Sequence, residues 1–144
     1  MAEKVSGLAQ ATPILRVKDF EASLRYYTEK LGFKVDWKTS NFGSVTRDRC
    51  SLMLTEDGQG HAGTWVWIGA EDAELLFAEW SESGAMLRQG PTNFPWGSLE
   101  IQVTDPDGHV LRFGSEGKEG MPYGPWMDAE GKMWPIGADG EGAG

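Results

Sequence analysis

Tryptophan is the side chain whose number and spacing say most about what this sequence can bind. The 144 residues include seven tryptophans. Trp65 and Trp67 are two residues apart, so in a strand both point to one face of a sheet while Val66 and Ile68 point to the other. If helices cover the Val66 side, the indoles line a concavity and can stack on flat heteroaromatic rings or attract cations. A tryptophan-rich core or dimer interface is the other interpretation, and the pattern alone leaves both open.

Further aromatic and polar residues flank these tryptophans in the expected order of strands. Trp37 ends one strand, and Trp96 lies just before another. Asp36 beside Trp37 supplies a carboxylate, and Glu100 and Gln102 lie on the polar side of their strand. These residue types would add polar or negative groups to an aromatic cleft.

Histidine and cysteine give little support to metal or nucleophilic catalysis. His61 in a glycine-rich loop and His109 after a turn do not form a spaced pair, so we interpret both as solvated loop residues. Cys50 belongs with the apolar positions of a predicted hairpin, which favours a buried, inert thiol. The sequence has neither a Gly-x-Ser-x-Gly elbow nor a phosphate-binding glycine loop. A metal site assembled from distant strands is left open, because spacing along the chain does not test it.

The charge balance and composition exclude several classes of function. Asp and Glu number 22 against 13 Lys and Arg, a formal net charge of −9, so we expect no nucleic-acid partner. The same charge favours a neutral or cationic partner. A single cysteine excludes an internal disulfide and fits a reducing compartment. No apolar run approaches the ~20 residues of a membrane span and the first residues lack the order of a signal peptide, so we predict a cytoplasmic protein with no membrane partner.

The hydrophobic pattern predicts one order of elements twice, namely strand, helix, strand, strand, strand, offset by roughly 50 residues. The first set comprises a strand at 13–18, a helix at 20–31, a half-buried strand at 33–38 and strands at 45–49 and 51–55. The second comprises a strand at 64–68, a helix at 71–83 and strands at 86–87, 98–103 and 110–113. Turns are expected at 41–43 and 105–108. The order predicts paired sheets around a shared concave face, with the helices outside.

The residues beyond about 116 differ in kind from the rest. They are rich in Gly and Pro, with Tyr123, Trp126 and Trp134 interspersed. Residues 126–134 fit a small hairpin, and residues 137–144 have no core-forming side chains, so we expect them to fray.

Several motifs resemble those of the vicinal oxygen chelate superfamily, which includes glyoxalase I, extradiol dioxygenases, fosfomycin-modifying enzymes and bleomycin resistance proteins. The resemblance rests on residues 17–27, on Leu31-Gly32-Phe33 and on Asp105-Pro106-Asp107-Gly108. A narrower similarity to the bleomycin resistance proteins covers residues 10–116. It rests on Asn41-Phe42-Gly43 with Val45 and Arg47-Asp48, on Trp65-Val66-Trp67-Ile68, on residues 77–82 and on Pro95-Trp96-Gly97.

The resemblance implies an α+β fold of two βαβββ modules that form a curved mixed sheet with a concave cleft. The domain would cover residues 1–116, with modules at about 12–57 and 63–116, and residues 117–144 would be a C-terminal extension. The resemblance also implies a homodimer with two crevices at the subunit interface.

The function implied by the resemblance is non-catalytic sequestration of a cationic bleomycin-type glycopeptide, and hence antibiotic resistance. Carried over by position, the ligand-binding residues would be Asp36, Trp37, Phe42, Thr55, Trp65 and Trp96. The crevice would be aromatic and acidic, and no cofactor is implied.

The position of Arg112 argues against the metalloenzymes of this superfamily. Those enzymes carry a ligand carboxylate four residues after the turn glycine, where this chain has Arg112, and the first-strand ligand position falls near Thr12 or Pro13. We therefore expect no metal ligands and no catalytic residues, and we favour a binding protein over an enzyme while leaving that question open. The alternatives are a divalent-metal lyase, isomerase or dioxygenase of the same superfamily, and a protein that binds another aromatic or cationic metabolite.

Overall fold

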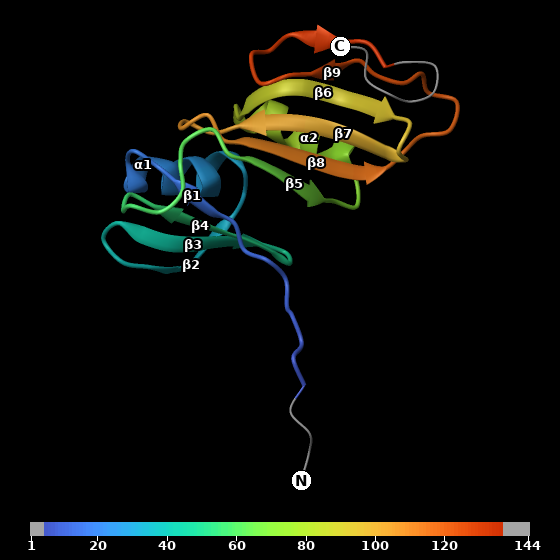
Figure 1. Cartoon of the computed structure of the whole chain (residues 1–144). Coiled ribbons are helices and arrows are strands. Elements are labelled where there is room, and N and C mark those ends of the chain that lie inside the picture. The colour runs from blue at the N-terminus through green and yellow to red at the C-terminus, as the bar shows by residue number, and fades with distance from the viewer. Residues whose placement is uncertain (1–4, 137–144) are drawn as a thin grey trace.

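Two modules of the same topology make up most of the chain in a computed structural model that describes residues 5–136 (Figure 1). The expected fraying of residues 137–144 lies outside this range. The first module consists of β1 (Ile14–Arg16), α1 (Phe20–Arg25), η1 (Tyr26–Lys30), β2 (Lys34–Lys38), β3 (Phe42–Arg47) and β4 (Cys50–Thr55). The second consists of β5 (Trp65–Gly69), α2 (Ala73–Ser83), β6 (Met86–Phe94), β7 (Ser98–Thr104) and β8 (Val110–Glu116).

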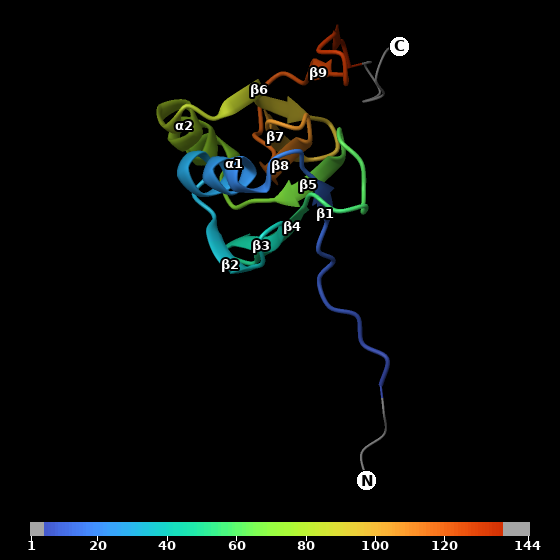
Figure 2. The same ribbon diagram turned by 90° about the vertical axis from the view of Figure 1, so that its left-hand side faces the viewer.

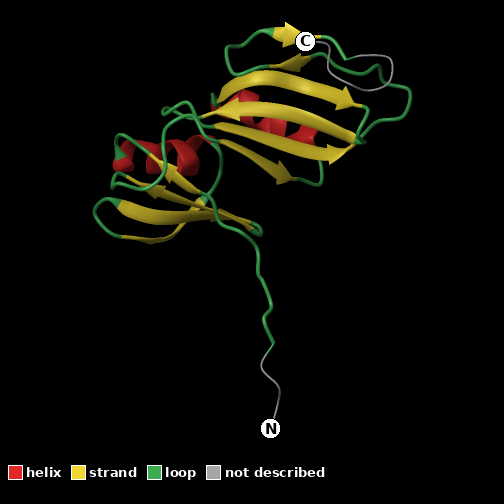
Figure 3. Ribbon diagram, viewed as in Figure 1, coloured by secondary structure: helices red, strands yellow, loops and turns green. Residues whose placement is uncertain are grey.

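Each module folds its strands into a four-stranded mixed sheet. The strand orders are β1-β4-β3-β2 and β5-β8-β7-β6, and in both sheets the first strand runs parallel to its neighbour while the other pairs are antiparallel. The sheets are visibly curved, and a short third sheet follows near the C-terminus (Figure 3). The predicted α+β fold of two βαβββ modules is therefore confirmed.

The helices begin and end at residues suited to those positions. Asp19 accepts a hydrogen bond from the backbone of Ala22 at the start of α1, and Asp72 does the same for Leu75 at the start of α2. Gly84 ends α2 with φ of 83°, a left-handed conformation that glycine adopts without a steric cost. The first helix continues into the π-helical segment η1. Among residues 5–136, no helix has both the length and the apolar character needed to cross a membrane.

One hydrophobic core joins both modules. Leu15, Val45, Leu52 and Leu54 from the first sheet are fully buried, and so is Leu111 from the second. The helices contribute further buried residues, Phe20, Leu24, Tyr27 and Trp80. Figure 2 shows the two helices on the same side of the molecule. Each sheet therefore has one face against this core and one face turned away from it.

The turns between the last two strands of each module reach the other module. Asp105, in the β7–β8 turn, is buried and accepts a 2.8 Å hydrogen bond from the hydroxyl of Tyr27. Burial raises the pKa of Asp105. Arg47, at the corresponding turn of the first module, donates to Glu79 of α2 at 2.7 and 2.8 Å. We call these reciprocal contacts the inter-module joint.

The expectation that His109 is a solvated loop residue is wrong. Its side chain is fully buried between the modules. Nδ1 accepts a 3.0 Å hydrogen bond from the backbone N–H of Thr64, so Nε2 carries the proton and donates to the carbonyl of Arg16 at 2.6 Å. The turn that precedes His109 carries the ring back between β1 and β5, a placement that the sequence spacing does not reveal.

Two local expectations about β2 and β3 are also wrong. Residues 42 and 43 belong to β3 rather than to a turn, and Gly43 is required because a Cβ there would lie 2.8 Å from both the ring of Phe20 and the carbonyl of Trp37. The predicted half-buried strand β2 is exposed throughout. It is an edge strand, and a bulge between Val35 and Trp37 interrupts its alternation.

Candidate functional site

The alternation of β5 places its tryptophans on the side of the second sheet that faces away from α2. Trp65 is 39% exposed and Trp67 is 54% exposed, whereas Val66 and Ile68 pack against the core. We call this side of the sheet the second face. The exposure of both indoles places them outside the core of the chain, and a ligand cleft and a dimer interface both stay open as interpretations.

The strand register assembles a polar centre on the second face. Trp67 is paired with Arg112, Arg112 with Gln102, and Glu100 with Gly114, so their side chains share one side of the sheet. A Cβ at Gly114 would lie 2.4 Å from the indole of Trp67. The Trp67 ring therefore occupies space that a side chain at position 114 would fill.

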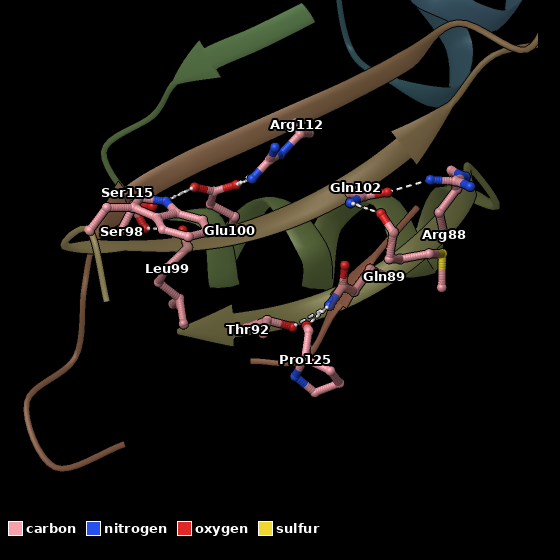
Figure 4. A network of polar contacts seen from close by, with 12 residues as sticks. Arg88, Gln89, Thr92, Ser98, Leu99, Glu100, Gln102, Arg112, Ser115 and Pro125 are labelled. Carbon is pink, nitrogen blue, oxygen red and sulfur yellow. Dashed lines mark hydrogen bonds and ion pairs between the residues drawn. The ribbon is translucent and has the colours of Figure 1, made fainter. Parts of the chain in front are cut away.

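Glu100 is the best-anchored polar residue of this face, with 2% of its surface exposed. It accepts a 3.0 Å hydrogen bond from Nε of Arg112 and a second one from Nη2, and it also accepts from Nε1 of Trp96 at 2.8 Å and from the hydroxyl of Ser98 (Figure 4). Burial by itself would raise the pKa of Glu100, but the hydrogen bonds and the charge of Arg112 outweigh it, and the pKa is lowered. Glu100 is therefore an ionised carboxylate whose charge is balanced within the protein.

A C-terminal segment, residues 118–129, lies against β6 and β7, and we call it the strap. Asn93 donates to the carbonyls of Lys118 and Met121 at 2.9 and 3.0 Å. Gln89 donates to the carbonyl of Pro125 at 2.7 Å (Figure 4). These contacts are made to main-chain carbonyls of the strap, so they hold its backbone in position and do not depend on its side chains.

Arg88 continues the row of strap contacts at the second face. Its guanidinium donates to Gln102 and to the carbonyl of Asp128, the latter at 2.9 Å. The same group lies 5.5 Å from the centre of the Trp65 ring. Arg88 thus links the strap to the aromatic part of the face, a role for which the sequence carries no signal.

The end of the strap is the first strand of the hairpin that the sequence predicts. The hairpin pairs β9 (Trp126–Met127) with β10 (Met133–Trp134), and the two indoles are stacked 6.1 Å apart. Asp128 accepts hydrogen bonds from the turn and from Nε1 of Trp134, which hold its pKa below the usual value.

The side of the first sheet opposite α1, which we call the first face, carries a different set of residues. The rings of Trp37 and Phe42 stack 5.4 Å apart at an angle of 28°. Phe42 is paired in register with Thr55, whose side chain is fully buried and accepts a 3.1 Å hydrogen bond from the backbone N–H of Asp57. Asp36 lies in the bulge of β2 and is exposed.

The six residues predicted to bind ligand fall into two groups within one chain. Four lie on the first module, namely Asp36, Trp37, Phe42 and Thr55, and two lie on the second, Trp65 and Trp96. Trp96 stacks on Phe94 with ring centres 4.6 Å apart and planes 5° apart. Within residues 5–136 the structure records no ring stacking or hydrogen bond between the two groups, so their union in one crevice stays a prediction.

Arg112 occupies the strand position at which the resemblance would put a metal-binding carboxylate. Its guanidinium is committed to Glu100 in the structure. In the part of the chain that the structure describes, no group of three or more His, Cys, Asp or Glu side chains is arranged to hold a metal ion. What this face does offer is a cation, a buried anion and exposed indoles.

Two βαβββ modules with open sheet faces make up the glyoxalase-type fold, and this fold gives the class of the protein. The match to a family model over residues 7–113 is more specific, and the chain belongs to the Glyoxalase/Bleomycin resistance protein/Dioxygenase superfamily. Among curated protein sequences, none matches this chain significantly. The family match ends before the strap.

Solved structures with the same fold include two that are linked to bleomycin. The bleomycin-binding protein of the bleomycin-producing Streptomyces verticillus, in complex with copper(II)-bleomycin, is 25% identical with a TM-score of 0.65, and the alignment covers 79% of this chain and 100% of that one. A bleomycin resistance determinant encoded on the transposon Tn5 is 22% identical with a TM-score of 0.66, covering 76% and 98%. TioX from Micromonospora sp. ML1 is 18% identical with a TM-score of 0.64, covering 75% and 98%.

Proposed function

We propose that the protein is a non-catalytic binder that sequesters a bleomycin-type glycopeptide and so confers antibiotic resistance in the cytoplasm. The observation that carries this proposal is that both open faces display a stacked aromatic pair with an exposed tryptophan, Trp37 on Phe42 and Trp96 on Phe94. The likeness to the Streptomyces verticillus bleomycin-binding protein supports the choice of ligand. Flat rings such as a bithiazole suit exposed indoles, which offer stacking area.

The ligand would lie between two copies of the chain. In a single chain, the first and second faces belong to separate sheets, and among residues 5–136 no ring stacking or hydrogen bond links their predicted binding residues. In a homodimer, the first face of each copy could lie against the second face of its partner. The six predicted residues would then come together at two equivalent crevices. The exposed tryptophans of both faces would then be covered.

The affinity that sequestration requires limits what stacking alone can contribute. A dissociation constant of roughly 1 μM corresponds to about −8 kcal/mol. Each aromatic pair supplies about 0.5–1.5 kcal/mol beyond area burial, so apolar burial must supply much of the rest. Asp36 on the exposed bulge is the carboxylate that we place near the cationic part of the ligand.

Calorimetric titration with bleomycin, together with light scattering, tests this proposal. We expect binding at micromolar concentration or below, a dimer, and weaker binding for both Trp37→Leu and Trp96→Leu. Trp134→Leu is the matched control, because Trp134 lies in the C-terminal hairpin outside the six predicted residues. Absence of binding heat at tens of micromolar, or equal losses in all three variants, contradicts the proposal.

A further inference from the structure

The balance of charged groups at the centre of the second face differs from that of the whole chain. The chain carries a formal charge of −9. At this centre, however, two guanidinium groups, those of Arg88 and Arg112, lie beside a single buried carboxylate, that of Glu100. Among the other acidic groups, Glu116 is exposed at the end of β8, and Asp128 keeps its negative charge but directs its carboxylate at Trp134 and at the backbone of its own turn, so the structure pairs neither of them with Arg112.

Arg112 is held in place and keeps donors to spare. Nε and Nη2 both donate to the same oxygen of Glu100, which fixes the plane of the guanidinium. For Nη1 the structure records no hydrogen bond to any residue between 5 and 136, and 28% of the side chain is exposed. A guanidinium fixed on one side and open on the other is preorganised to receive an oxyanion, since little side-chain entropy remains to be lost.

Arg88 is engaged differently, although it adds to the positive charge. Its Nη1 donates to Gln102, its Nη2 donates to the strap carbonyls of Asp128 and Ala129, and its guanidinium lies over Trp65. Both terminal nitrogens of Arg88 therefore already have a partner, whereas Nη1 of Arg112 has none among residues 5–136.

An aromatic platform adjoins Arg112. Trp67 is the register partner of Arg112, is 54% exposed, and has its indole over Gly114. A planar ring stacked on Trp67 would bring an acidic substituent to Arg112. We infer that the second face binds aromatic carboxylates, with the carboxylate on Arg112 and the ring on Trp67.

This inference goes beyond the proposed sequestration of a cationic glycopeptide, because it assigns a ligand class of opposite charge to one face. Stacking does not depend on the sign of the charge that the ring's substituent carries. A charge-assisted hydrogen bond to Arg112 requires that charge to be negative. The inference therefore makes a prediction about the ligand's charge that the proposed function does not make.

Three ligands with the same ring test the inference in the full-length protein: 2-naphthoate, 2-naphthamide and 2-naphthylmethylammonium. We expect tryptophan fluorescence quenching to report naphthoate binding at least about tenfold tighter than naphthamide, with the ammonium compound weakest and the preference reduced by added salt. Equal affinity for the acid and the amide, or a preference for the ammonium compound, overturns the inference.

Variants of the ion pair locate the site. Arg112→Gln combined with Glu100→Gln removes both charges without leaving either unpaired, and we expect it to abolish the preference for naphthoate over naphthamide. Arg112→Lys retains the positive charge but loses the planar guanidinium with its several N–H donors. We expect this variant to keep part of the preference for naphthoate over naphthamide. Arg25→Gln, on the exposed side of α1, is the matched control for the loss of one cation and is expected to keep all of it.

The outcomes separate this inference from the proposed function. Urea unfolding first establishes that each variant is folded. A preference for naphthoate that survives in the doubly substituted protein overturns the assignment to Arg112. Naphthoate binding by a wild-type protein that gives no binding heat with bleomycin supports this inference and contradicts the proposed function, whereas bleomycin binding without any preference for naphthoate does the reverse.

Discussion

The first and second faces arise from the same topology but differ in how their polar groups are satisfied. On the first face, the aromatic pair of Trp37 and Phe42 lies beside the buried hydroxyl of Thr55, and the carboxylate of Asp36 is exposed to water. On the second face, a carboxylate is almost fully buried against Arg112. The strap borders only the second face, through contacts with β6 and β7.

The difference shows that one module topology can carry two kinds of surface. The residues that point into the core have the same task in both modules, which is to bury apolar area. The residues that point away from it are free of this constraint, so the first face carries one aromatic pair beside an exposed carboxylate, while the second combines aromatic rings with a preorganised ion pair. The following predictions test this contrast in order of decreasing effect.

The largest expected effect is the loss of the buried carboxylate. Glu100→Ala removes the acceptor of Arg112, Trp96 and Ser98, and we expect it to lower the free energy of unfolding by about 3 kcal/mol. The matched change on the first face, Asp36→Ala, removes an exposed carboxylate and should change stability by less than about 0.5 kcal/mol. Urea denaturation measures both, and equal effects would abolish the contrast between the faces.

Loss of an anchor of the strap is expected to have the next largest effect. Asn93→Ala removes hydrogen bonds to Lys118 and Met121, and we expect a loss of about 2 kcal/mol together with faster tryptic cleavage after Lys118. Asn41→Ala, which removes two exposed side-chain hydrogen bonds beside the first sheet, one to Asp57 and one from Thr39, is the control. Unchanged cleavage of the Asn93 variant would show that the strap does not depend on this anchor.

The change in the free energy of unfolding between neutral and acidic pH tests the same comparison. Because the folded protein lowers the pKa of Glu100 below its ordinary value of 4.5, its contribution is complete above that value and is lost as the pH falls through the folded pKa. Subtracting the unfolding free energies of Glu100→Gln from those of the wild type, from neutral pH down to about 3, should therefore give a difference that shrinks on acidification. A constant difference contradicts the ion-pair assignment.

The smallest expected effect is on the first face. Trp37 is 44% exposed, so Trp37→Leu removes mainly its stacking on Phe42, and we expect a loss of about 0.5–1 kcal/mol in the urea midpoint analysis. A loss as large as that of Glu100→Ala would mean that the first face is a structural core rather than a surface for a ligand.

The sequence predicts the fold well because its determinants are local. Periodic apolar residues, the capping aspartates Asp19 and Asp72, and the terminal glycine Gly84 specify each module within a short stretch of chain. The alternation of Trp65 with Val66 likewise predicts which side of β5 is open, because strand geometry has a period of two.

The polar centre of the second face was less predictable because its members are distant in the chain and are joined by register. Arg112 was identified only as a position where a ligand carboxylate is missing, and its pairing with Glu100 depends on how β7 and β8 align. Arg88 carries no local signal at all, since its partners include carbonyls of the strap about 40 residues later. His109 was misjudged for the same reason, because its partners come from β1 and from the residue before β5.

The inter-module joint has a consequence for the kinetics of folding. In the joint, the hydrogen bond between Tyr27 and Asp105 spans 78 positions, and beside the joint the hydrogen bond between His109 and Arg16 spans 93. Closing such long loops costs entropy before the contacts return any stability, so the joint forms after the local hairpins and helices. Weakening the joint, for example by Tyr27→Phe, would then act mainly on the rate at which the native protein opens rather than on the rate at which it forms. The lifetime of the folded chain thus depends on the two turns that join its modules.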